Sequence, residues 1–541
     1  MLTGMGDVMR RWNGWGDEAT QVELPAHGEA FLAELVGVGQ RLTDASLEQV
    51  MARVPASRLT AHPLISLDAE VRVRHARGQS LPDWLAMRSG DFGVFPDGVA
   101  FPETAAQIRE LLAWAQQHDV TLIPYGGGTS VAGHINPLPG SRPVLTLSLE
   151  RMTRLLEIDE ESLIATFGPG ANGPQVESQL RARGYTLGHF PQSWELSTLG
   201  GWVASRSSGQ QSLRYGRIEQ LFAGGKLETF AGTLESPTFP ASAAGPDLRE
   251  LVLGSEGRFG VISEVRVRIS PLPEQERFYA VFLPDWPRAL SAIRRLAQAR
   301  VPLSMLRLSN AVETRTQLAL AGHPQQIALL EKYLALRGAG EGKCMLTFGV
   351  TGSRVQNAAS LKQARRLLKG FGGVFTGTLL GRKWEQNRFR FPYLRHGLWE
   401  CGYLVDTLET ATDWANVDNL LNRIEAALRE ELAGDGERVH VFTHLSHVYG
   451  EGSSIYTTYV FRPGGDYTEA LARWQRLKGA ASRVIAANRG TISHQHGVGR
   501  DHAPYLAVEK GELGMATLHS LARHFDPERR LAPGVLLQDH D

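Results

Sequence analysis

The stretch TISHQHGVGR, Thr491 to Arg500, sets His494 and His496 one residue apart and follows them with Gly-Val-Gly. Histidine titrates near neutral pH, so such a pair can transfer protons or stabilise a developing negative charge. On a strand, alternation places His494 and His496 on one face and Gln495 on the other. The same spacing is compatible with core histidines and with a metal pair, so this stretch alone leaves three interpretations open.

A glycine triplet gives the sharpest local signal in the chain. PYGGGTSVAG, Pro124 to Gly133, begins as the short buried strand VTLIPY ends. Consecutive glycines let the backbone approach a ligand closely, and their N–H groups can hold a phosphate or pyrophosphate. The loop matches neither the Walker pattern nor GxGxxG, and by itself it is equally compatible with a turn. Two more loops rich in glycine and hydroxyl groups, at 197–209 and 254–263, indicate one extended ligand such as a dinucleotide.

Tyr456 and Arg307 also have side chains suited to chemistry, each with a structural alternative. In SSIYTTYVF, Tyr456 shares a strand face with Thr458 and Val460. A phenol exchanges protons only if neighbours lower its pKa from about 10, and otherwise such a tyrosine is a hydrogen-bonded core residue. Arg307 in LRLSN has a planar fork suited to phosphate or carboxylate, but an internal salt bridge explains it equally well.

A metal centre is the competing interpretation of the histidines. HVFTHLSHVY adds His440, His444 and His447 to the pair at 494 and 496. Spacings of four and three residues on a strand do not converge on one point, and HExxH is absent. The sequence therefore predicts no metal.

Composition excludes several classes of protein. Lys+Arg and Asp+Glu both number 57, which argues against a nucleic-acid partner. Cys344 and Cys401 are the only cysteines and lie far apart, so we expect a reducing compartment and a cytoplasmic location. We find no secretory signal, no apolar stretch long enough to span a membrane, and no peroxisomal tripeptide at the end.

The chain is too long for one hydrophobic core, since 541 residues call for several packed units. Thr104 and Gln107 predict a capping box, followed by a buried stripe of Ile108, Leu111, Leu112 and Ala115. GVISEVRVRISP alternates apolar and charged residues, which predicts a half-exposed strand ending near a boundary at Pro271. Beyond it, strands and helices interleave as in an α+β sheet domain with helices on one face.

These motifs occur together in a known family. The chain contains, in this order, RWNGWG, IPYGGGTSV, GHFPQSWELSTLGGWVASRSSG, YGRIEQL, GSEGRFGVISEV, LRLSN, SSIYTTYVF and TISHQHGVG. It resembles flavoproteins of the vanillyl-alcohol-oxidase and p-cresol-methylhydroxylase (PCMH) type, and among them the alkyldihydroxyacetonephosphate synthases. The glycine triplet and GSEG occur across the flavoprotein superfamily, whereas RWNGWG, LSTLGGW and the histidine stretch are more specific to the synthases.

The resemblance implies an α+β fold in which a two-subdomain, PCMH-type FAD-binding domain precedes an α+β cap. The expected divisions are an N-terminal helical segment at 1–92, the FAD-binding domain at 93–272, the cap and substrate domain at 273–498, and a C-terminal helical segment at 499–541 that docks back on the FAD domain.

The resemblance also implies site residues. Tyr456 aligns with the family's catalytic tyrosine and Arg307 with its substrate-binding arginine. His494 and His496 match the first and third of three consecutive histidines, while Gln495 replaces the second. His444 stands where the synthases have an arginine, so we expect it at the substrate. FAD, held noncovalently although some relatives tether it through a histidine placed like His134, is expected to contact Pro124, Tyr125, Gly126, Gly127, Gly128, Thr129, Ser130, Gln192, Ser193, Trp194, Glu195, Leu196, Ser197, Thr198, Ser205, Arg206, Ser207, Ser208, Glu256, Gly257, Arg258, Phe259, Gly260, Val261 and Ile262.

The family's reaction replaces the acyl group of acyl-dihydroxyacetone phosphate by a long-chain alcohol through a covalent adduct on flavin N5, with no net redox change. Tyr456 would handle the proton, Arg307 the phosphate, and His494 and His496 the charge near N5. Gln495 and His444 also favour an alternative, an FAD-linked dehydrogenase or oxidase of a hydroxy acid or alcohol. A metal-dependent hydrolase or a non-catalytic binding protein is the alternative of another class. We expect a small-molecule or lipid-like substrate, and peripheral membrane contact through the N-terminal helices and a homodimer stay open.

Overall fold

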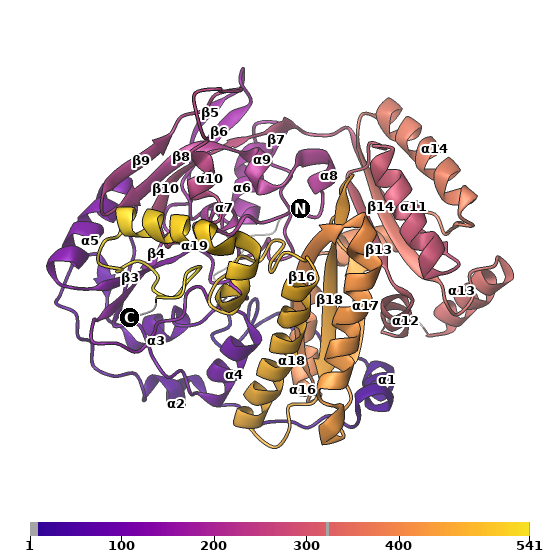
Figure 1. Cartoon of the computed structure of the whole chain (residues 1–541), viewed down its shortest axis with the longest axis horizontal. Coiled ribbons are helices and arrows are strands. Elements are labelled where there is room, and N and C mark those ends of the chain that lie inside the picture. Colours follow the sequence, from indigo (N-terminus) through magenta and orange to yellow (C-terminus); the bar gives the residue numbers. More distant parts are fainter. Residues whose placement is uncertain (1–8, 321–323, 540–541) are drawn as a thin grey trace.

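A computed structural model describes residues 9–320 and 324–539 of the chain (Figure 1). In this described part the strands form sheets of seven, five, four and two strands. None of the described helices is both long and apolar enough to cross a membrane. The predicted α+β fold is confirmed, and the three larger sheets determine where the site forms.

The four-stranded sheet carries the glycine triplet. Its order is β1 (Ile65–Ser66), β2 (Gly98–Ala100), β4 (Val144–Ser148) and β3 (Thr121–Tyr125). The last three strands are parallel, and β3 is almost wholly buried. The triplet starts directly after Tyr125, where β3 leaves the sheet, so its backbone amides lie at the carboxyl edge of a parallel sheet. Ligands commonly bind at such an edge.

Helix α5 (Ala105–Gln117) begins where the sequence predicts. Thr104 Oγ1 accepts a hydrogen bond from Gln107 N at 3.3 Å, but the Gln107 side chain accepts from Glu103 N at 2.6 Å instead of from Thr104. Half of the predicted capping box therefore forms. The predicted apolar stripe is buried in full and consists of Ile108, Leu111, Leu112 and Ala115.

The five-stranded sheet is antiparallel throughout. Its order is β5 (Leu155–Asp159), β6 (Ile164–Phe167), β10 (Val261–Arg268), β8 (Phe222–Thr229) and β9 (Gly232–Ser236). Along the second half of β10, buried valines alternate with half-buried charged residues, as the sequence predicts. A short pair of β7 (Tyr185–Thr186) and β11 (Ser270–Pro271) follows at the chain's passage to the large sheet.

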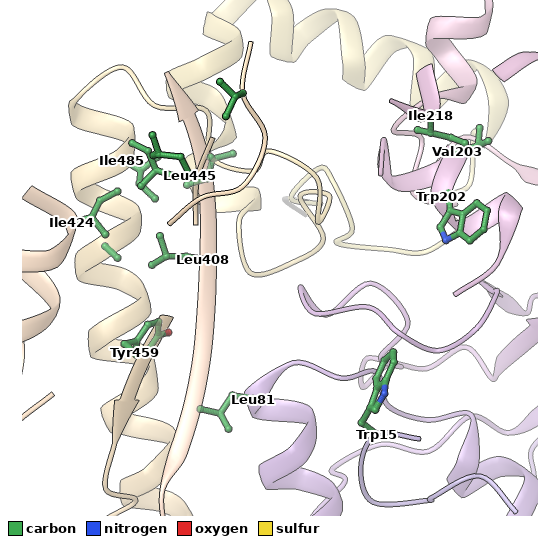
Figure 2. Packing of buried hydrophobic residues seen from close by; sticks show 14 of the residues in the cluster. Trp15, Leu81, Trp202, Val203, Ile218, Leu408, Ile424, Leu445, Tyr459 and Ile485 are labelled. Carbon is green, nitrogen blue, oxygen red and sulfur yellow. The ribbon is translucent and has the colours of Figure 1, made fainter. Parts of the chain in front are cut away.

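The seven-stranded sheet forms the second half of the molecule. Its order is β15 (Val374–Phe375), β12 (Gln275–Leu283), β14 (Cys344–Gly352), β13 (Met305–Ser309), β17 (His440–Leu445), β18 (Gly452–Phe461) and β16 (Leu404–Asp413). Helices α11 (Trp286–Gln298), α14 (Arg354–Gly370), α17 (Trp414–Glu431) and α18 (Tyr467–Ala487) cover one face (Figure 1). Leu408 and Leu445 of the sheet pack there with Ile424 and Ile485 of the helices (Figure 2). The opposite face is left to line a cavity.

The remaining helices connect these layers. In the first half of the sequence they are α1 (Ala26–Val36), which packs against the second half of the molecule, α2 (Leu47–Met51), α3 (Ala69–Arg74), α4 (Leu81–Ser89), α6 (Gly173–Arg181), α7 (Leu199–Ser205), α8 (Ser212–Tyr215), α9 (Ile218–Leu221) and α10 (Arg249–Val252). In the second half they are α12 (Ala311–Ala319), α13 (Pro324–Leu336), α15 (Leu379–Asn387) and α16 (Phe391–Glu400). Helix α19 (Leu506–Phe525) returns across the first half of the molecule (Figure 1).

The segment after α19 extends the four-stranded sheet. Leu122 N donates to Arg530 O at 2.8 Å, and Ala532 N donates to Leu122 O at 2.9 Å. The stretch 491–500 before α19 is a loop, which corrects the prediction of a strand there. Strand alternation therefore does not apply to His494, Gln495 and His496, and their directions follow from individual contacts.

Candidate active site

One cavity of about 770 Å³ lies between the loops of the first half and the open face of the seven-stranded sheet. Tyr456, Thr458 and Val460 of β18 all line it, as alternation along that strand predicts. The neighbouring strands contribute His444 from β17 and Thr407 from β16. A polar cluster from the cap thus faces the glycine loop across a single space.

The glycine loop is packed so tightly that only glycine fits. A Cβ at Gly127 would overlap the carbonyl oxygen of Leu196, and one at Gly126 would meet Thr198 Oγ1. Gly128 has a φ of +64°, in the left-handed region. The loop therefore exposes backbone to the cavity rather than side chains. This cradle of amides fits a pyrophosphate-bearing cofactor.

Most of the residues predicted to contact FAD line the cavity. From the glycine loop all seven do so, Pro124 to Ser130. From the other loops the cavity wall includes Gln192, Ser193, Ser197, Thr198, Ser205, Ser207, Glu256, Gly257, Gly260 and Ile262. Three loops that are far apart in the sequence thus meet at one space, as the sequence predicts for one extended ligand.

Eight predicted contact residues do not line the cavity: Trp194, Glu195, Leu196, Arg206, Ser208, Arg258, Phe259 and Val261. Their side chains have other partners. Arg258 donates to Leu531 O at 2.7 Å, and Arg206 forms an ion pair with Glu250 at 2.8 Å. Trp194 stacks on Phe389, with ring centroids 4.8 Å apart. The structure therefore gives these residues a supporting place behind the loops.

Tyr456 stands at the centre of the polar cluster. Its hydroxyl donates to Thr407 Oγ1 at 3.2 Å, and its ring stacks on His444 at 4.7 Å between centroids. Burial raises the pKa of Tyr456 well above its ordinary value of 10. This corrects the sequence expectation that neighbours lower it, so the phenol stays protonated at neutral pH.

Arg307 is already paired on the cavity wall. Its Nη2 donates to Glu313 Oε1 at 2.6 Å, while Glu313 Oε2 lies 2.9 Å from His444 Nδ1. Asn310 caps α12 by accepting from Glu313 N at 2.9 Å, which fixes the glutamate's position. Burial opposes ionisation, but His444 and Arg307 together lower the pKa of Glu313 to about 2. Burial and Arg307 lower the pKa of His444, against the opposite effect of Glu313. Arg307 thus forms an internal salt bridge and also lines the cavity, so both interpretations from the sequence apply.

Glu409 lies beneath the loop at 494–496, which is part of the loop at 491–500. It is the direct cross-strand partner of Tyr456, which in turn faces His444, so the three share one level of the sheet. Loop 494–496 covers Glu409: Gln495 Nε2 donates to its Oε2 at 2.5 Å, and His496 Nε2 lies 4.0 Å away. Burial opposes its ionisation, but the surrounding histidines hold the pKa of Glu409 well below its usual range. Gln495 and His496 line the cavity above it.

His494 is turned away from the cavity, which corrects the prediction that it shares a face with His496. Arg217 Nη1 lies 2.6 Å from His494 Nε2, and Tyr449 Oη lies 2.7 Å from the same atom. Arginine can only donate, so Nε2 must accept and the ring proton must sit on Nδ1. Nδ1 lies 3.3 Å from Glu409 Oε1 but forms no hydrogen bond with it. His494 is therefore a buried link between Arg217 and Glu409.

Among the described residues, one set of side chains around Glu409 is close enough together to hold a metal ion. One ligand atom each from Glu409, His447 and His494 lies within 4.8 Å of the others. The hydrogen bond from Arg217 argues against a bound metal, because it puts the proton on His494 Nδ1 and leaves that atom no free lone pair. His447 Nδ1 also lies 3.1 Å from Ser208 Oγ. The grouping is better explained as a hydrogen-bonded network that joins the two halves of the molecule.

Glu256, in the loop at 254–263, binds the loop at 491–500. Its carboxylate accepts from Val498 N at 2.6 Å and Gly499 N at 2.7 Å, and His134 Nε2 lies 3.0 Å from it. Glu256 has a φ of 52°, which is unfavourable for a residue with a side chain. A strained residue that makes two backbone hydrogen bonds to the loop after His496 has a positioning role.

A large part of the remaining cavity wall is apolar. Along β18 the wall changes from Tyr456 through Thr458 to Val460, and along β16 from Thr407 to Val405. Helices α1, α12, α13, α15 and α16 continue this surface with Leu32, Leu318, Ile327, Leu380, Trp384, Phe391, Leu394 and Leu398, and Leu24 and Leu320 add to it beside α1 and α12. The polar cluster thus opens into a space suited to an aliphatic chain.

Known proteins share this organisation. Two family models match the chain, an FAD binding domain at residues 96–236 and the C-terminal domain of FAD linked oxidases at residues 272–536. An alkyldihydroxyacetonephosphate synthase of Trypanosoma brucei brucei is 28% identical over 97% of this chain and 92% of that protein. A solved alkyldihydroxyacetonephosphate synthase has a TM-score of 0.82 at 25% identity, covering 97% of this chain and 98% of that one. p-Cresol methylhydroxylase with substrate bound shares the fold, with a TM-score of 0.65 at 15% identity over 88% of this chain and 95% of that one.

The domain matches and the loops around the cavity define the class. The chain belongs to the FAD-dependent enzymes with a PCMH-type FAD-binding domain, and FAD is its cofactor. Within that class it is a homologue of the alkyldihydroxyacetonephosphate synthases, and the resemblance seen in the motifs is confirmed.

Four residues of the site escaped the sequence analysis: Glu313, Glu409, Thr407 and Arg395. Glu313, Thr407 and Arg395 line the cavity, while Glu409 lies behind it and holds Gln495. The only signal for Glu409 is in LVDTLETATD, a strand-like stretch with carboxylates at 406 and 409. Its partners could not be read from that pattern, because they come from the loop at 494–496.

Proposed function

We propose that the chain catalyses exchange of the acyl group of acyl-dihydroxyacetone phosphate for a long-chain alcohol. The observation that carries this proposal is the single cavity in which the FAD-binding loops, a polar cluster and a long apolar wall meet. A small hydroxy acid would leave the eight apolar side chains that these five helices contribute without a ligand group to contact. The homology to alkyldihydroxyacetonephosphate synthases supports the same substrates.

The backbone amides of Gly126 to Ser130 would hold the pyrophosphate of FAD, and the bound cofactor would supply an electrophilic, redox-active ring. Side chains of the protein bind the substrate and position its reacting groups. Arg307 offers its remaining N–H groups to the phosphate, while Glu313 keeps the guanidinium in place. Tyr456, protonated because burial raises its pKa, acts as a hydrogen-bond donor to the substrate.

His496 is the proton acceptor of the proposal. Burial lowers its pKa, against the effect of Glu409, so the imidazole is neutral at pH 7 and able to take a proton. Glu256 holds the following backbone at Val498 and Gly499, and Glu409 holds Gln495. His496 is thereby fixed from both sides, as a general base must be.

The test is exchange without an electron acceptor. FAD-loaded protein, acyl-dihydroxyacetone phosphate and labelled hexadecanol are incubated anaerobically, and label is expected in an ether-linked product. Absence of labelled product, together with flavin bleaching by a hydroxy acid, would replace the proposal by the second candidate, an FAD-linked dehydrogenase. His444 on the cavity wall is the observation that favours that candidate, since a histidine there can take a hydroxyl proton.

A further inference from the structure

Glu409 fixes the orientation of the Gln495 side chain. A carboxylate can only accept hydrogen bonds, and Gln495 Nε2 lies 2.5 Å from Glu409 Oε2. The opposite orientation would bring the amide oxygen against the carboxylate. The carbonyl oxygen Oε1 of Gln495 is therefore turned away from Glu409, on a side chain that lines the cavity.

Gln495 Oε1 is an acceptor without a partner of its own. Among the hydrogen bonds of the described residues it takes part in none, although Gln495 Nε2 does. It is also absent from the buried polar atoms that lack partners, so it is open to the cavity. The wall around it holds the donor Arg307 and also acceptors that are already engaged: Glu313 accepts from Arg307, and the Thr407 hydroxyl accepts from Tyr456. The polar end thus offers in Gln495 Oε1 a neutral amide acceptor that no protein group occupies.

We infer that Gln495 is the residue that recognises the alcohol substrate, by accepting the hydrogen of its hydroxyl group at Oε1. The inference deepens the proposed function and rests on it. The apolar wall that starts at Thr458 and continues to Val460 receives the alkyl chain, which places the hydroxyl at the end of the cavity where Gln495 lies. Glu409 is the positioning residue that sets the direction of the amide.

This arrangement also selects against a fatty carboxylate. Its oxygens would face the oxygen of Gln495, with the ionised Glu409 directly beneath. Like charges and facing acceptors both disfavour that ligand. The site therefore discriminates the entering alcohol from the carboxylate that the exchange releases.

The test compares three ligands of equal chain length on FAD-loaded protein: 1-dodecanol, dodecyl methyl ether and dodecanoate. The ether keeps the oxygen but has no hydrogen to donate. We expect the alcohol to bind about 3- to 10-fold more tightly than the ether, as is usual for one neutral hydrogen bond. Gln495→Met should reduce this ratio to about one and leave ether binding unchanged. Glu437→Gln, which removes a carboxylate outside the cavity, is the control and should keep the ratio.

Exchanging the amide of Gln495 and the carboxylate of Glu409 gives a second, independent test. Glu409→Gln alone frees the Gln495 amide to rotate and should lower the alcohol-to-ether ratio. The double variant Glu409→Gln, Gln495→Glu again places an acceptor toward the cavity and should restore it. An unchanged ratio in Gln495→Met, or no preference in the unmodified protein, overturns the inference. If the preference is present but no labelled ether product forms, the proposed function fails, and Gln495 is left as a residue that binds alcohols without a part in the exchange.

Discussion

Arg307 and Glu313 form an ion pair on the cavity wall, with Nη2 2.6 Å from Oε1. The positive charge that the resemblance assigns to substrate phosphate is therefore largely compensated before substrate binds. Glu313 also contacts His444, so it holds two cavity residues at once. Phosphate recognition at Arg307 then depends on the direction of its free N–H groups more than on net charge.

Glu313→Gln should raise the affinity of the holoenzyme for dihydroxyacetone phosphate. Because the pKa of Glu313 is lowered to about 2, the substitution removes a full negative charge at neutral pH. Loss of that competing charge is worth on the order of 1 kcal/mol at a partly exposed site, or about fivefold in Kd. Titration calorimetry at low salt measures it. Glu437→Gln, which removes a carboxylate paired with Arg462 outside the cavity, serves as control. Weaker phosphate binding in Glu313→Gln alone would contradict the prediction.

Substitutions of His494 and His496 should affect different properties of the protein, namely stability for His494 and catalysis for His496. His496→Gln removes the proposed base and should lower kcat by about 10² to 10⁴. His494→Gln should lower kcat far less, but should reduce the free energy of unfolding by about 1–3 kcal/mol, because Arg217 and Glu409 lose a buried partner. Single-turnover exchange and urea unfolding measure the two effects. Equal losses of kcat in both variants would show that His494 reaches the reaction.

The sequence predicts the loops better than the network behind them. Glycines directly after a buried strand and a tyrosine on an alternating strand have local signatures, and they meet at the cavity as expected. His494 and Glu409 have none, because their directions depend on contacts between segments far apart in the chain. The loop at 491–500 is held by hydrogen bonds that it donates to Glu256 and Glu409, so strand alternation does not apply to it. Fixed cross-strand register, such as Glu409 opposite Tyr456, becomes visible only once the sheet order is known.

The pH dependence of exchange should report His496. Burial lowers its pKa below the ordinary 6.5, so the neutral base prevails above that value and kcat/KM should fall only as pH drops through the lowered pKa. Glu409 raises the pKa of His496, so Glu409→Gln should move this acid limb to still lower pH. Profiles from pH 4 to 9, with Glu437→Gln as control, check both points. An acid limb above 6.5, or an upward shift in Glu409→Gln, would remove His496 from the role of base.

Gly127→Ala should weaken FAD binding. The added Cβ would overlap the carbonyl oxygen of Leu196, and that backbone atom cannot rotate away as a flexible side chain could. The two loops that hold the cofactor must therefore separate, at an overpacking cost of about 1–3 kcal/mol, or roughly 5- to 150-fold in Kd. Quenching of flavin fluorescence on titration of apoprotein measures the affinity. Gly140→Ala is the matched control, since a Cβ there meets no atom within 4 Å. If both variants bind FAD like the unmodified protein, the amides of this loop do not form the cofactor cradle.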